Sequence, residues 1–133
     1  MSARREIVDA AGAPPAIGPY SHAVLFDARA AGALLFCSGQ IPLDPHTGQI
    51  EGTTAPEQAR RCLENLRAVC EAAGARLEQA VRVTLYMTDL ADFDEVNEVY
   101  GGFFGEEPPA RVTVGVAQLP RGAYDEIDAI VAL

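Results

Sequence analysis

Residues 54–74 read TAPEQARRCLENLRAVCEAAG, and residues 81–88 follow as VRVTLYMT. In the first stretch, apolar side chains recur every three or four residues, which places them along one side of an α-helix. Thr54 and Glu57 have the spacing of a capping box, and Gly74 suits the position after the last turn. The second stretch alternates apolar and polar residues, which is typical of a half-buried strand. We therefore predict a helix followed by a strand.

Two short apolar runs precede this unit, at residues 23–27 and 33–38. Small residues that include Gly32 separate them, so the pair predicts two strands and a turn. Residues 44–48, DPHTG, concentrate turn formers and predict a surface loop.

The chain after residue 88 predicts one more helix and two more strands. The helix begins near Asp92 and is expected to fray at Gly101 and Gly102, because glycine disfavours helix interiors. Residues 111–118 and 124–133 are rich in β-branched residues and alternate in polarity, so they predict two closing strands.

These elements, in the order β-β-α-β-α-β-β, predict a single α/β (α+β) domain over residues 1–133. We expect one mixed sheet with both helices packed on one face. The opposite sheet face would then lack a cover, and closed symmetric oligomerisation is the usual way to bury such a face.

Composition and charge narrow the classes of function. Ten basic against nineteen acidic residues give a net charge of −9, which argues against nucleic acid as a partner. No apolar run approaches the ~18 residues that span a bilayer, so we expect a cytoplasmic protein without membrane contact. Three cysteines without CxxC spacing and two distant histidines, His22 and His46, predict no metal site.

Five motifs, taken together and in order, resemble the RidA (YjgF) family. Three are contiguous: AIGPYS at 16–21, SGQIP at 38–42 and PARVTV at 109–114. Two weaker ones are QAR with LENL at 58–66, and the pattern from Asp89 to Tyr100 around the second helix. The resemblance covers residues 8–133.

The resemblance implies a chorismate-mutase-like fold and a homotrimer whose three sheets line a central barrel, with ligand clefts between neighbouring subunits. It implies a hydrolytic deaminase that converts 2-aminoacrylate or 2-iminobutanoate to 2-keto acids and ammonia without a metal or organic cofactor. Three alternatives remain open: a non-catalytic trimer that binds a small keto or amino acid, a deaminase of another catabolic enamine, and the ribonuclease activity attributed to some relatives. The negative net charge weighs against the last.

Three residues acquire catalytic roles through the resemblance. Arg111 would grip the carboxylate of a small substrate with two parallel N–H bonds, although an arginine at the start of a valine-rich strand can also pair structurally with a carboxylate. Glu126 would orient or deprotonate the attacking water, the alternative being a solvated strand edge. Tyr20 would face the ligand, the alternative being core packing with a bonded hydroxyl.

Further positions would bind substrate by the same resemblance: Ser38, Gly39, Phe93, Asn97 and Thr113. A plain turn, core packing and local hydrogen bonding are the competing explanations for the first four. Thr113 departs from the family, whose close members commonly carry Cys there. The segment Gly105–Pro108 is shorter than the family's usual one, so the cleft lip and substrate preference are open.

Arg111 and Glu126 fall on the two closing strands. A simple hairpin would hold them about five residues, or roughly 16 Å, apart. The family's sheet instead inserts the last strand between earlier ones. We therefore expect the pair to converge across or beside a subunit interface.

Overall fold

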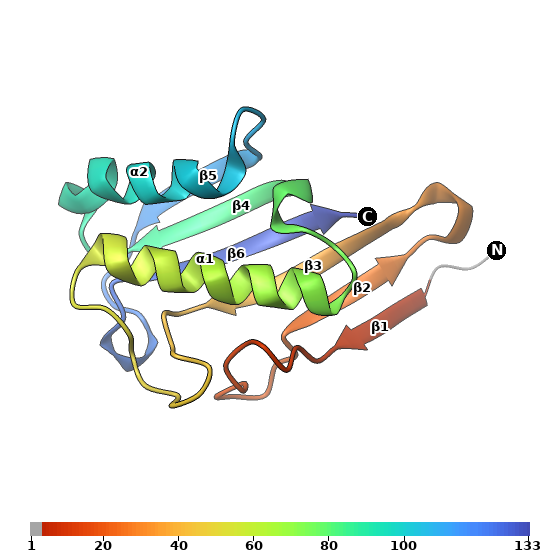
Figure 1. The fold of residues 1–133 in the computed structure, drawn as a ribbon, viewed down its shortest axis with the longest axis horizontal. Helices are drawn as coiled ribbons and strands as arrows, with labels where there is room; N and C mark the ends of the chain where they lie inside the picture. Colours follow the sequence, from red (N-terminus) through yellow and green to blue (C-terminus); the bar gives the residue numbers. More distant parts are fainter. Residues whose placement is uncertain (1–3) are drawn as a thin grey trace.

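A six-stranded mixed sheet organises the chain in the computed structural model, which describes residues 4–133 (Figure 1). The strands are β1 (Arg4–Val8), β2 (Ala23–Asp27), β3 (Ala33–Gln40), β4 (Ala80–Met87), β5 (Ala110–Gly115) and β6 (Asp125–Ala132). Their spatial order is β1-β2-β3-β6-β4-β5, and only β4 and β5 run parallel. The last strand therefore lies between β3 and β4, while β5 forms an edge.

Both helices cover the same face of this sheet (Figure 1). Helix α1 (Ala55–Ala72) packs against β6 and β3, and α2 (Phe93–Phe104) lies beside α1. The predicted capping box is present: the Thr54 hydroxyl accepts a bond from the Glu57 amide, and the Glu57 carboxylate accepts one from the Thr54 amide. The mixed sheet with two helices on one face is thus confirmed.

The core forms between these helices and the inward side of the central strands. Leu35, Leu85 and Ile127 point from β3, β4 and β6 and are fully buried, as are Leu66 and Val69 from α1. Burial of a side chain of this size contributes roughly 1.5–3 kcal/mol, so the alternation of each strand fixes which face meets the helices.

The other sheet face has no cover within residues 4–133. Its large apolar side chains, Phe26, Phe36, Val112 and Val114, are 36–43% exposed. Such a patch is typical of a surface that meets other protein, so the expected oligomer stays a prediction that this face supports.

The structure differs from the predicted elements in three places. Strand β1 was not predicted, because a five-residue edge strand with two arginines carries little hydrophobic alternation. Helix α2 does not fray at Gly101 and Gly102 but continues to Phe104, because Phe103 and Phe104 bury the last turn in the core. Strand β5 is also shorter than predicted, since it ends at Gly115.

Candidate functional site

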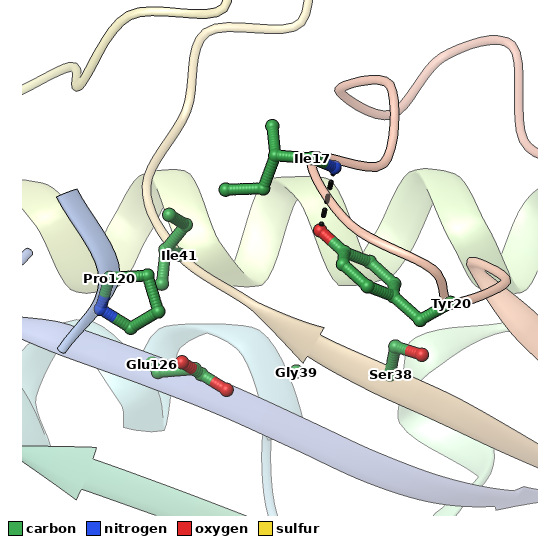
Figure 2. A pocket seen from close by; sticks show the side chains of 7 residues that line it. All are labelled: Ile17, Tyr20, Ser38, Gly39, Ile41, Pro120 and Glu126. Carbon is green, nitrogen blue, oxygen red and sulfur yellow. Dashed lines mark hydrogen bonds between the residues drawn. The ribbon is translucent and has the colours of Figure 1, made fainter.

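The chain carries two separate clusters of predicted site residues. The first surrounds a pocket of about 300 Å³, which we call the Glu126 pocket (Figure 2). Its lining comes from four segments of the chain and consists of Ile17, Tyr20, Ser38, Gly39, Ile41, Pro120 and Glu126. Four predicted residues, Tyr20, Ser38, Gly39 and Glu126, therefore meet in one place.

Glu126 lies on β6 directly beside Gly39 of β3. A β-carbon at Gly39 would overlap the Glu126 Oε2 atom and lie 3.0 Å from Cδ and 3.1 Å from Cγ. The register of β3 against β6 shifts between Cys37 and Gln40, so the glycine sits in an irregular part of the ladder. The missing side chain thus makes room for the carboxylate, which explains a glycine here better than a plain turn.

The surroundings of Glu126 also change its acidity. The side chain is half-buried, and this burial raises the pKa of the Glu126 carboxyl; the nearby negative charge of Asp128 raises it further. A carboxylate with a raised pKa is a better proton acceptor near neutral pH than an ordinary glutamate.

Tyr20 and Ser38 border the pocket through different contacts. The Tyr20 ring is 43% exposed, so it is not core packing, and its hydroxyl oxygen accepts a 3.1 Å bond from the Ile17 amide (Figure 2). The Ser38 hydroxyl donates a 2.6 Å bond to the Ser21 carbonyl. The Tyr20 hydroxyl can therefore still donate a hydrogen bond to a ligand, whereas the Ser38 hydroxyl already donates its proton to the Ser21 carbonyl.

His22 holds the segment that carries Ile17 and Tyr20. Its Nδ1 accepts a 2.9 Å bond from the Ala10 amide, so Nε2 carries the proton and donates to the Pro14 carbonyl at 2.7 Å. The ring is 6% exposed and saturated, so His22 is structural.

Two buried amides of α1 hold the other pocket walls. Asn65 donates from Nδ2 to the carbonyls of Ile41 and Leu43, and the Gln58 side-chain carbonyl accepts a 2.7 Å bond from the Tyr124 amide, just before β6. Sequence reasoning assigned these residues no role. The available signal was two polar residues on the helix side that otherwise buries apolar ones.

The second cluster surrounds Arg111 on β5, and we call it the Arg111 clamp. The guanidinium carbon lies 4.7 Å from the centre of the Tyr100 ring and 5.6 Å from that of Phe93, both on α2. No hydrogen bond or ion pair joins this guanidinium to any of residues 4–133. The side chain also lines a cavity of about 340 Å³ together with Asn97 and the lip residues Pro108 and Pro109.

Several polar atoms around the clamp also lack a partner. Asn97 Oδ1, Tyr100 Oη and Thr113 Oγ1 are buried and form no hydrogen bond within the described part of the chain. A buried polar group without a partner costs about 1–3 kcal/mol. Such a cluster next to an unpaired cation is therefore more typical of a binding site than of a core. The structural ion pair considered for Arg111 is absent among residues 4–133.

The two clusters lie on opposite faces of the sheet. In the strand register, Arg111 lies beside Val83, which faces the core, and its side chain lies under α2. Glu126 lies beside Tyr86 and points to the uncovered side. Two strand spacings and three residues of offset place the two positions about 10 Å apart across the sheet and about 10 Å along it. One chain therefore cannot bring both side chains to one small molecule.

Tyr100 is the residue of the clamp that sequence reasoning missed. It had been named only as the last residue of a weak family motif, without a role at the site. Phe93, Asn97 and Tyr100 follow one another at i, i+4 and i+7, the spacing of a single helix side, so the aromatic pair flanking a polar residue was the available signal.

The described residues contain neither a metal-binding cluster nor a membrane-spanning helix. No group of three or more His, Cys, Asp or Glu side chains within residues 4–133 is arranged to hold a metal ion. Neither α1 nor α2 nor any shorter helix of this range has the length and apolar character needed to cross a bilayer.

Comparison with known proteins gives consistent results. The family model described as Endoribonuclease L-PSP matches residues 10–133. Protein DfrA of Myxococcus xanthus is 52% identical over 95% of this chain and 94% of its own length. The human 2-iminobutanoate/2-iminopropanoate deaminase is 40% identical over 95% of this chain and 88% of its own. The crystal structure of E. coli TdcF with bound serine superposes with a TM-score of 0.86 at 40% identity, covering 96% of this chain and 98% of that one. The chain therefore belongs to the RidA (YjgF) family, as the five motifs indicated.

Proposed function

We propose that this protein is a hydrolytic deaminase that converts 2-aminoacrylate and 2-iminobutanoate to 2-keto acids and ammonia. Its active site would combine the Arg111 clamp of one subunit with the Glu126 pocket of a neighbour. The observation that carries this proposal is a guanidinium without an acidic partner among residues 4–133 on one sheet face and a half-buried carboxylate on the other.

Arg111 binds the substrate carboxylate in this proposal. A guanidinium and a carboxylate match in shape and form two parallel N–H···O bonds. Each charged bond of this type contributes about 1.5–3 kcal/mol, and the pairing also fixes the orientation of the substrate. The aromatic rings of the clamp leave the N–H groups of Arg111 available for it.

Glu126 acts on the water in the chemical step. The enamine first tautomerises to the imine, with one proton moving from nitrogen to the terminal carbon. Water then adds its oxygen to the C=N carbon and gives one proton to Glu126, while the imine nitrogen takes up one proton from solvent. Glu126 next returns its proton to the amino group of the carbinolamine, the C–N bond breaks to release ammonia, and the hydroxyl proton passes to solvent as the keto acid forms. Positioned proton transfer of this kind contributes ~10²–10⁴ in rate.

The family supports the same reaction class. A human relative at 40% identity bears the name of an imine deaminase, and the TdcF structure holds serine. Both names concern small amino-acid-derived molecules with a carboxylate, which suits a shared site that combines Tyr20 of one subunit with Arg111 of its neighbour.

A trimer would place the two clusters together. The uncovered sheet face carries both exposed apolar side chains and Glu126, so a neighbour that covers this face also reaches the pocket. Three equivalent interfaces of a cyclic trimer then create three sites, each shared by two subunits.

The direct test is a coupled assay. A serine or threonine dehydratase generates the reactive intermediate, and keto-acid formation is followed with and without this protein. We expect faster formation with the protein; an unchanged rate over a wide range of its concentration contradicts the proposed activity.

A mixing experiment tests whether the site is shared. Arg111→Ala and Glu126→Gln chains are each expected to be inactive, but trimers co-expressed from both contain interfaces with an intact Arg111 and an intact Glu126. Random assembly predicts recovery of about a quarter of wild-type activity. A site built within one chain predicts no recovery.

The non-catalytic binding trimer makes a different prediction for one variant. In a deaminase, Glu126→Gln abolishes turnover and spares the affinity for a stable 2-keto acid. In a binding protein no turnover exists to be lost, and the wild type itself leaves the coupled assay unchanged while binding the keto acid.

A further inference from the structure

The guanidinium of Arg111 is held by ring faces and not by hydrogen bonds. It lies over Tyr100 at 4.7 Å and over Phe93 at 5.6 Å, and it bonds to no side chain or carbonyl of residues 4–133. We propose that Tyr100 is a positioning residue, whose ring fixes the plane of the Arg111 guanidinium so that its N–H edge faces the cavity. This inference rests on the proposed function in taking a carboxylate as the ligand.

Tyr100 is itself held rigidly enough for this role. Its side chain is 6% exposed, and its ring packs on Phe104 with 4.6 Å between ring centres. Its hydroxyl has no hydrogen-bond partner in the described chain, so packing and not the hydroxyl decides where the ring lies. The ring face is therefore the part of Tyr100 that acts on Arg111.

Holding an arginine by its faces has a chemical advantage. The side chain has many rotamers, and each must be given up when a ligand binds. An acidic partner would fix the guanidinium but would also occupy the N–H groups that a substrate needs. Aromatic faces restrict the side chain and leave all five donors for the ligand.

The same helix contains a matched control. Phe103 is 9% exposed and lies under the guanidinium of Arg67, also at 4.7 Å from the ring centre. Arg67 lines the groove between α1 and α2, away from the clamp, and forms a 3.7 Å ion pair with Glu78. Phe103→Leu therefore removes an equivalent ring and an equivalent contact without touching Arg111.

Two measurements test the role of Tyr100. Calorimetry with 2-oxobutanoate gives Kd, and the coupled assay gives kcat and KM. Tyr100→Leu is expected to raise Kd and KM about 3- to 30-fold with a smaller change in kcat, the range expected for a lost cation–π contact. Tyr100→Phe restores the ring and should bring both values to within about twofold of wild type, and Phe103→Leu should leave them unchanged.

A third measurement does not depend on any ligand. Relaxation of the ¹⁵N–¹H Nε signal of Arg111, assigned by its loss in Arg111→Lys, reports how rigid the side chain is. We expect a rigid signal in the wild type and Tyr100→Phe, and a mobile one in Tyr100→Leu.

The outcomes separate the two proposals. A mobile Arg111 in the wild type, unchanged affinity and mobility in Tyr100→Leu, or an equal loss in Phe103→Leu overturns the positioning role. Equal loss in Tyr100→Phe and Tyr100→Leu overturns it in favour of the hydroxyl. A rigid Arg111 that loosens in Tyr100→Leu, in a protein that neither binds 2-oxobutanoate nor turns over imine, supports the positioning role and contradicts the proposed function. If Tyr100→Leu does not fold, a mobile Arg111 in the wild type still overturns the positioning role.

Discussion

The Arg111 clamp and the Glu126 pocket have opposite electrostatic properties. The clamp keeps a permanent cation in one orientation between two aromatic rings on an edge strand. The pocket places a carboxylate on a central strand, where burial and Asp128 make its charged form less favourable. The first arrangement suits recognition of an anion, and the second suits exchange of a proton.

This difference predicts different kinetic signatures for the two regions. Changes at the clamp should act on substrate affinity as well as on the reaction, because the carboxylate is bound throughout. Changes in the pocket should act mainly on kcat, because proton transfer occurs only in the chemical step. Each variant below asks whether that division holds.

Among the conservative variants of the two regions, Arg111→Lys should have the largest effect. Lysine keeps the positive charge but loses both the paired N–H geometry and the planar surface that lies on Tyr100. We expect kcat/KM to fall by about 100-fold, chiefly through KM, as measured in the coupled assay.

Arg60→Lys is the matched control for that change. Arg60 is exposed on α1 and borders the outer groove between the helices, so its replacement should leave kcat and KM unchanged. Wild-type kinetics in Arg111→Lys would show that only a positive charge is needed, and the geometric argument for the clamp would be wrong.

Gly39→Ala should have a smaller effect, confined to kcat. The new methyl group would occupy the place of the Glu126 carboxylate, and the flexible end of that side chain would move aside. We expect kcat to fall about tenfold with little change in KM or in melting temperature, because the fold itself need not adjust.

Gly102→Ala tests the specificity of that result. A β-carbon at Gly102 meets no atom within 4 Å, so alanine there should stabilise α2 by about 0.5–1 kcal/mol without changing kcat. A Gly39→Ala enzyme with full kcat would show that Glu126 acts from another position.

Local patterns were sufficient to predict most of the fold. The capping box and the apolar stripe identified α1, and alternation in β4 and β6 identified which side chains face the helices. These signals succeed because they depend on neighbours within one turn or one strand. The alternation of apolar and polar residues in β1 was too weak to predict a strand. In α2, the burial of Phe103 and Phe104 stabilises the last turn in spite of Gly101 and Gly102, so the predicted fraying does not occur.

The candidate site was only partly accessible to such reasoning. Arg111 and Glu126 were named through family motifs, but their placement on opposite faces depends on β6 lying between β3 and β4. A hairpin of the two closing strands fits the local pattern equally well, so the local sequence does not show that β6 lies between β3 and β4. The role of Tyr100 likewise depends on which strand passes beneath α2.

Asp125 offers the closest comparison with Glu126, because the two carboxyls are adjacent on β6 and point to opposite faces. Asp125 points inward, is fully buried and has no hydrogen-bond partner for either oxygen among the described residues. Burial, and secondarily the charge of Asp92, raise the pKa of Asp125 to about 7. It has no contact with the Glu126 pocket and no role in the proposed reaction.

The smallest effect on activity is therefore expected from Asp125→Asn, together with a clear effect on stability. Between pH 4 and 7 the folded protein keeps the Asp125 proton while the unfolded chain, with its ordinary lower pKa, releases it. The free energy of unfolding should thus fall as pH rises through this window, by up to a few kcal/mol. Asn cannot ionise, so the variant should lose this slope and exceed wild-type stability at pH 8.

Urea unfolding of the wild type and of Asp125→Asn at pH 5 and pH 8, at one protein concentration, measures this effect. The change in the free energy of unfolding between the two pH values is compared between the two proteins. Equal slopes would mean that Asp125 ionises in the fold without penalty, and a drop in kcat would assign it to the site after all.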